Sequence, residues 1–121
     1  MFRALQFLRG IALVAATLLN CEIALAEVDQ HSANSMMPAC RAFLLPNPPA
    51  TVLESFDSGR CAGVVEGLLY AASDICLPPN VVSAQSIRVV VKYIDDRPQR
   101  QHENFKALAL EALRAAWPCK H

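Results

Sequence analysis

Cysteines are the residues of this 121-residue chain with the greatest potential for chemistry, and there are five of them. Cys61 falls near the start of a predicted helix, where a helix dipole can activate a thiol, and His102 is a candidate base for a Cys-His nucleophile. The alternative is a structural half-cystine, which the even number of cysteines after residue 26 favours. We therefore expect Cys61 to be disulfide-bonded and not catalytic.

Other arrangements of reactive side chains match a catalytic or metal site poorly. Asp95 and Asp96 are adjacent at a predicted helix end, which is typical of solvated residues rather than of paired catalytic acids. Cys119 and His121 lie close in sequence, but no Cys-x-x-Cys and no two histidines one helical turn apart support a zinc site. Phosphate-binding, dinucleotide-binding and serine-hydrolase motifs are absent. The sequence predicts no enzyme, no metal and no cofactor.

Residues 1–26 have the pattern of a secretory signal peptide. Their first nine residues carry two arginines and no acid, Gly10–Leu19 is almost wholly apolar, and Ala24–Ala26 has the small-x-small form of a cleavage site. The apolar run is too short for a permanent membrane helix. Acylation of Cys21, as in a lipoprotein, is a poorer fit, because the preceding residue is not small. We expect a mature domain of residues 27–121 in the bacterial periplasm.

This mature domain is close to neutral, with nine Lys and Arg and ten Asp and Glu. No basic face favours nucleic acid as a partner, and no block of charge predicts a disordered tail. A domain of this size has a limited core, so we expect two disulfides to stabilise it.

Apolar residues recur at helical spacing in four segments, which predicts an all-α fold, a small four-helix bundle. The predicted helices cover residues 35–43, 58–72, 84–95 and 99–117, with Ser58 and Ser83 as N-caps. Thr51 and Glu54 have capping-box form, which we interpret as a lead-in turn. The apolar face of the last helix consists of Phe105, Leu108, Ala109, Ala112, Leu113 and Ala116.

Gly59, Gly63 and Gly67 lie four residues apart in the second predicted helix. Each costs about 1 kcal/mol relative to alanine inside a helix. Their spacing predicts a smooth groove that lets another backbone approach closely. The neighbour is either another helix of this chain or a second subunit.

Helix geometry favours one pairing of the four remaining cysteines. Cys61 and Cys76 are separated by a helix about 18 Å long, whereas a disulfide needs Cα atoms within about 7 Å. If the last two helices run antiparallel, Cys119 returns to the region of Cys76. We therefore predict the disulfides Cys40–Cys61 and Cys76–Cys119.

The connector before the last predicted helix mixes both charge signs with amides. A loop held between packed helices can present such groups to a partner protein, although an ordinary solvated turn is an equally good interpretation. The candidate contact residues are Asp95, Asp96, Arg97, Gln99, Arg100 and His102.

Four short runs occur in order along the mature chain: Ala39–Arg41, Cys61–Gly67 with Cys76–Pro78, Val89–Ile94 with Pro98, and Glu111–Leu113 with Trp117–Cys119. Together they resemble the Rap/Tai family of type VI secretion immunity proteins. Val64 departs from the family pattern, which often has an aromatic residue after the glycine, and the proline-rich loop 45–49 is unusual.

The resemblance implies an all-α periplasmic protein, often a homodimer. Family members bind a peptidoglycan amidase effector, block its active-site cleft, and need no chemistry of their own. The alternative is a periplasmic stress or chaperone-like helical protein with no cognate toxin, which would bind unfolded clients and open with pH. The few histidines, including His31 and His102, give little support for such a switch.

Overall fold

The computed structural model describes residues 29–47 and 49–120, so the predicted signal peptide lies outside the described residues. The described residues form four α-helices, one short 3-10 helix and no β-strand, which confirms the all-α prediction. No helix in this part of the chain combines the length and apolar character needed to cross a membrane. The elements are α2 (Ala33–Phe43), α3 (Val52–Ala71), α4 (Ser83–Asp95), η1 (Pro98–Arg100) and α5 (Phe105–Ala116).

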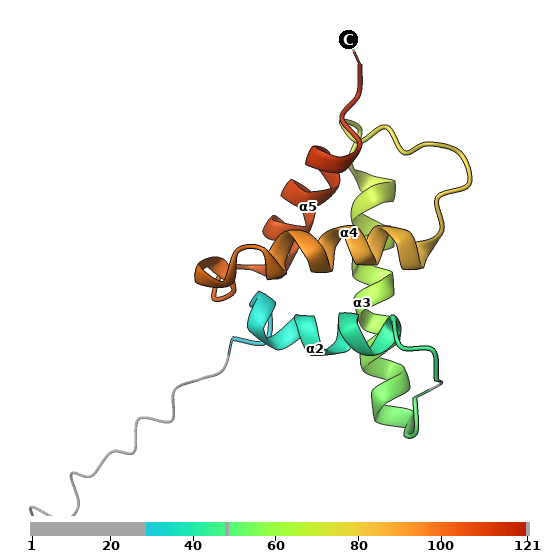
Figure 1. Cartoon of the computed structure of the whole chain (residues 1–121), viewed down its shortest axis with the longest axis vertical. Coiled ribbons are helices and arrows are strands. Elements are labelled where there is room, and N and C mark those ends of the chain that lie inside the picture. Colours follow the sequence, from blue (N-terminus) through green and yellow to red (C-terminus); the bar gives the residue numbers. More distant parts are fainter. Residues whose placement is uncertain (1–28, 48, 121) are drawn as a thin grey trace, which may run out of the picture.

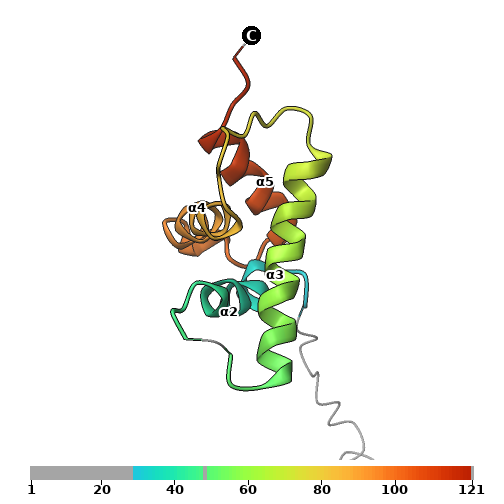
Figure 2. The same cartoon turned by 90° about the vertical axis from the view of Figure 1, so that its right-hand side faces the viewer.

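The longest helix, α3, forms one side of the domain, and the other helices pack against it (Figures 1 and 2). Helices α2 and α4 cross α3 in opposite directions, one above the other in Figure 1, and α5 rises obliquely in the same general direction as α3. The core between them takes Cys61 and Val65 from α3 and the apolar faces of the other helices. Its largest fully buried side chains include Phe105, Met37, Ile87, Ile94, Leu108 and Leu113.

Helix α3 begins six residues earlier than the sequence predicted. Thr51 is its N-cap and accepts a hydrogen bond from the Glu54 amide, while the Glu54 carboxylate accepts from the Thr51 amide. This reciprocal capping box satisfies donors that would otherwise be unpaired, so the first turns form although they are exposed. The prediction that Ser58 caps the helix was wrong, because Ser58 lies buried inside it.

The starts of the other helices also differ from the predicted ones. Ser32 caps α2, which therefore begins at Ala33 and contains Pro38 in its interior. Ser83 is the first residue of α4 and not its cap, since its hydroxyl donates a hydrogen bond to Glu66 on α3. A hydroxyl with a tertiary partner is no longer available to the amides of its own helix.

Helix α5 begins at Phe105 and not at residue 99. The side chain of Asn104 accepts hydrogen bonds from the amides of Lys106 and Ala107, which fixes the N-terminus there. Residues 98–100 form a single 3-10 turn instead. The apolar face of α5 is as predicted except for Ala116, which is exposed.

Both predicted disulfides are present. The Cα atoms of Cys40 and Cys61 are 5.2 Å apart, and those of Cys76 and Cys119 are 4.8 Å apart. The Cys76–Cys119 prediction assumed that the last two helices run antiparallel, and this assumption was wrong. In Figure 2, α4 is seen almost end-on, whereas α5 runs obliquely. Cys119 instead returns to the C-terminal end of α3, beyond which Cys76 lies.

The three glycines of α3 have no close neighbour among the described residues. A Cβ atom built at Gly59, Gly63 or Gly67 would meet nothing within 4 Å beyond its own turn of helix. The interpretation that another helix of the same chain packs there was therefore wrong, because the core lies on the opposite face, with Cys61 and Val65. A second subunit remains as the predicted neighbour.

Candidate protein-binding site

The connector between α4 and α5, residues 96–104, is held by the N-terminal segment of the described chain. The amides of Ala33 and Asn34 donate to the carbonyl oxygens of Glu103 and Gln101, at 2.9 and 2.8 Å. The amide of Phe105 donates in return to the carbonyl of His31 at 2.8 Å. These backbone hydrogen bonds join segments about seventy positions apart, so the connector is anchored to the rest of the domain and is not a free turn.

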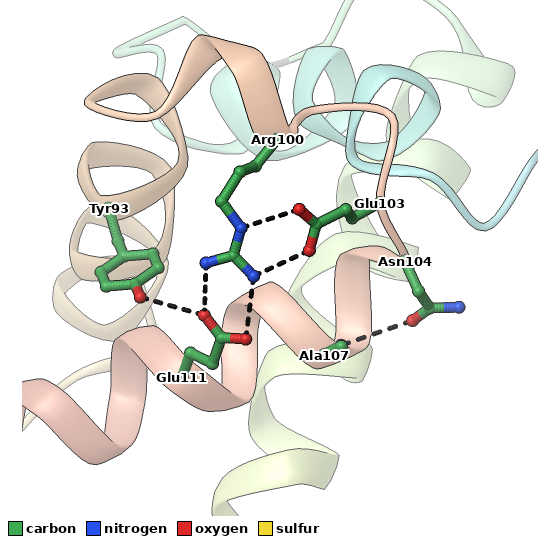
Figure 3. A network of polar contacts seen from close by, with 6 residues as sticks. All are labelled: Tyr93, Arg100, Glu103, Asn104, Ala107 and Glu111. Atoms are coloured by element: carbon green, nitrogen blue, oxygen red, sulfur yellow. Dashed lines mark hydrogen bonds and ion pairs between the residues drawn. The ribbon is translucent and has the colours of Figure 1, made fainter.

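Arg100 is the central residue of the connector (Figure 3). Its guanidinium donates to both carboxylate oxygens of Glu103, at 2.8 and 2.7 Å, and to both of Glu111, at 2.7 and 3.0 Å. The hydroxyl of Tyr93 on α4 donates to Glu111 at 3.0 Å. The network therefore ties α4, η1 and α5 together through planar, two-pronged contacts that only arginine can make.

The charges in this network stabilise one another. Hydrogen bonds from Arg100 hold the pKa values of Glu103 and Glu111 below their usual range, and Tyr93 adds to the effect at Glu111. The two carboxylates, Glu103 first, raise the pKa of Arg100 above its already high value. All three groups are therefore ionised near neutral pH, and Arg100 is engaged within the domain.

The other charged residues predicted as partner contacts also have partners within the chain. Asp95 accepts from Arg41 of α2 at 2.5 Å, and Asp96 pairs with Lys92 at 2.9 Å. The guanidinium of Arg97 lies 3.7 Å from the centroid of the Tyr93 ring and donates to the carbonyl of Tyr93. The two aspartates are nevertheless exposed, so each keeps an accessible carboxylate edge.

Gln99 and His102 are the two predicted contact residues whose side chains make no hydrogen bond to another described residue. Both are exposed. The structure thus divides the predicted set: Arg97 and Arg100 support the connector from within, whereas the exposed residues are Asp95 at the end of α4 and, on the connector itself, Asp96, Gln99 and His102. The sequence analysis missed the supporting residues Tyr93, Glu103 and Glu111, of which only Glu103, three residues after Arg100, gave a local signal.

The structure gives no support to a nucleophile at Cys61. Its sulfur is bonded to Cys40, and both residues are fully buried. In the described part of the chain, no group of three or more His, Cys, Asp or Glu residues is placed to hold a metal ion. One hollow of about 520 Å³ lies between the loop after α2 and the start of α3, and its lining residues include no titratable side chain.

Residues 32–119 match the family model of the Rap1a immunity proteins. The chain belongs to the Rap1a immunity protein family. The matched range contains all four helices, the connector and both disulfides, so the whole described fold is the family domain. No curated protein matches the chain.

Membership of the Rap1a family suggests a role in immunity to an effector and implies a protein as the binding partner. It also suggests an inhibitor that acts by binding rather than by catalysis. The connector presents exposed polar groups on a support that includes the ion pairs of Arg100 with Glu103 and Glu111.

Proposed function

We propose that this Rap1a family protein is exported to the periplasm, where it binds a type VI secreted peptidoglycan amidase and occludes its active site. The connector between α4 and α5 is the segment that enters or covers the cleft. The single observation that carries the assignment to immunity is the match of residues 32–119 to the Rap1a family, and the contacts of Arg100 with Glu103 and Glu111, which hold the connector against α5, support the choice of this segment.

A fixed connector favours tight binding for a physical reason. A flexible loop loses conformational entropy when it docks, and each immobilised side chain costs roughly 0.5–1.5 kcal/mol. Here the domain has already ordered the loop through backbone bonds to residues 31–34 and through the Arg100 network. The exposed side chains of Asp95, Asp96, Gln99 and His102 are then the groups that contact the effector.

Occlusion requires nothing reactive in the inhibitor. The partner needs only a surface complementary to the connector, and filling the cleft excludes the peptidoglycan substrate. The family resemblance also implies a homodimer. The proposed inhibition does not require one, since a single copy carries the complete connector.

The test is inhibition of a purified amidase effector on peptidoglycan by the disulfide-bonded domain of residues 27–121. We expect a stable complex and loss of hydrolysis. Gln99→Arg places a charged side chain on the connector and should weaken inhibition at least about tenfold, as expected for a central interface position. Gln85→Arg, the same substitution at an exposed position at the start of α4, is the matched control and should leave inhibition unchanged.

Two results would contradict the proposal. One is the absence of any complex with amidase effectors encoded beside this gene. The other is an inhibitory complex that tolerates Gln99→Arg and the equivalent change at His102 as well as it tolerates Gln85→Arg, because the connector would then lie outside the interface.

A further inference from the structure

A small apolar pocket lies where α2, α3 and the start of α5 come together (Figure 2). Its volume is about 120 Å³, and its apolar lining consists of Met36 from α2, Val64 from α3 and Phe105 from α5. Met36 and Phe105 are buried in the core and Val64 packs against it, so the pocket is a notch at the edge of the core. A space of this size takes one short side chain, since pockets for drug-sized ligands measure about 300–1,000 Å³.

Basic residues from three separate segments line the rest of the pocket. His31 lies in the N-terminal segment, Arg60 in α3 and Lys106 in the first turn of α5. None of the three has an ion-pair partner among the described residues. The guanidinium of Arg60 donates one hydrogen bond, to the carbonyl of Gln30 at 3.1 Å. The partial positive charge at the N-terminus of α5 adds to these charges. The pocket is therefore an apolar space with a positively charged rim.

The acidic side chains nearby lie outside this pocket. Asp29 accepts a hydrogen bond from the backbone amide of His31 at 2.9 Å, but it is not a lining residue. Glu54 and Asp57 line a neighbouring hollow, which Arg60 also borders. No described acid therefore lines the pocket itself, and an anion bound there would be surrounded by basic and apolar residues only.

We propose that this pocket binds the C-terminal residue of a peptide whose last side chain is small and apolar. The side chain enters the apolar space, and the terminal carboxylate accepts charge-assisted hydrogen bonds from Arg60 and Lys106. The imidazole of His31 is a third donor, in its neutral as in its charged form. A single residue satisfies both parts of the site, because its side chain and its carboxylate are attached to the same carbon atom.

Charge and size together favour a peptide over other carboxylates. A free amino acid carries an ammonium group beside its carboxylate, which Arg60 and Lys106 would repel, whereas in a peptide the same nitrogen is an uncharged amide. A long-chain fatty acid exceeds a space of about 120 Å³. The inference concerns this pocket alone and does not depend on binding or inhibition of an amidase.

The test is an NMR titration of the disulfide-bonded domain of residues 27–121 with the peptide N-acetyl-alanyl-valine. We expect saturable changes in the amide shifts of Val64, Phe105 and Lys106, with a dissociation constant on the order of 1 mM for so small a ligand. The same peptide with a C-terminal amide should bind at least about tenfold more weakly, because it lacks the charge that the basic residues recognise. Free valine should also bind more weakly, because its ammonium group is repelled.

Substitutions in the pocket locate the binding site. Val64→Phe places a larger side chain in the pocket and should abolish binding, and Val52→Phe, the same substitution at an exposed position of α3, is the control. Arg60→Gln and Lys106→Gln should each weaken binding by roughly twofold to fivefold, as expected for exposed ion pairs. Arg88→Gln, on the exposed side of α4, is their control and should leave binding unchanged.

The charge variants keep the proposal falsifiable if circular dichroism shows that Val64→Phe does not fold. Three results would overturn the proposal. The first is an absence of shift changes at the pocket residues, and the second is equal binding of the acid and amide peptides. The third is full affinity for the acid peptide in a folded Val64→Phe variant or in both charge variants.

Discussion

The guanidinium of Arg100 and the carboxylate of Glu111 are joined by two hydrogen bonds, with N···O distances of 2.7 and 3.0 Å. The residues belong to different elements, η1 and α5, and are eleven positions apart. The same guanidinium grips Glu103 with two further bonds. One planar group therefore holds the connector between α4 and α5 from both sides.

Arg100→Lys should loosen the connector while leaving the helices intact. A lysine ammonium is a single point donor that cannot hold two carboxylates through two-pronged contacts. We expect amide hydrogen exchange of residues 99–104 to accelerate by at least about tenfold, as local opening becomes easier. Exchange in the core of α3 should be unaffected. Arg88→Lys, on the exposed side of α4, is the control, and equal protection of the connector in both variants would show that Arg100 does not hold it.

Acid should weaken the same network. Arg100 lowers the pKa values of Glu103 and Glu111 in the folded state, so the unfolded chain binds protons more readily than the folded one. The stabilisation is therefore complete above the ordinary glutamate pKa of about 4.5 and is lost as pH falls through the lower, folded values. Below that pH, the thermal unfolding temperature of the wild type should fall more steeply than that of the Glu111→Gln variant. Parallel curves for the two proteins would refute this origin of the acid sensitivity.

The two disulfides should differ in their access to reductant. Cys40 and Cys61 are fully buried, whereas Cys76 is exposed and Cys119 is half-buried. Mild reduction followed by alkylation and peptide mapping should label Cys76 and Cys119 first. The Cys40–Cys61 and Cys76–Cys119 disulfides close loops of 21 and 43 residues, which correspond to about 3 and 4 kcal/mol of stabilisation in the chain-entropy model. Complete reduction should therefore unfold much of the domain, and labelling of Cys61 before Cys76 would contradict the described burial.

Ser58→Ala should leave stability unchanged or raise it. The hydroxyl oxygen of Ser58 is buried and has no hydrogen-bond partner among the described residues, so folding removes it from water without compensation. Alanine avoids this cost and is a better helix former, which together amount to about 1 kcal/mol. Urea unfolding measures the change, with Ser55→Ala, one turn earlier and exposed, as the control. A loss of stability specific to Ser58→Ala would contradict the prediction, because it would mean that the Ser58 hydroxyl makes a stabilising hydrogen bond.

Local patterns determined the number of helices and most of their buried faces. The apolar periodicity in α4, with Ile87, Val90 and Ile94, needs only the repeat of the helix itself to be recognised, and all three are buried. That Cys61 does not pair with Cys76 also followed from local geometry, since a straight helix keeps the two residues far apart, whereas the return of Cys119 to Cys76 depends on the tertiary arrangement. The runs of residues that resemble the immunity family lie in these same segments.

Tertiary structure decided where helices begin and what the polar side chains do. Ser83 had the type and position of a cap, but the arrival of Glu66 from α3 gave its hydroxyl a different partner. Asp95 has the appearance of a solvated residue in the sequence and pairs with Arg41, 54 positions away. The direction of α5 and the open face at Gly63 likewise depend on how the four helices cross. Periodicity is a property of neighbouring residues, whereas a hydrogen bond or an uncovered surface depends on which distant segment comes to lie beside it.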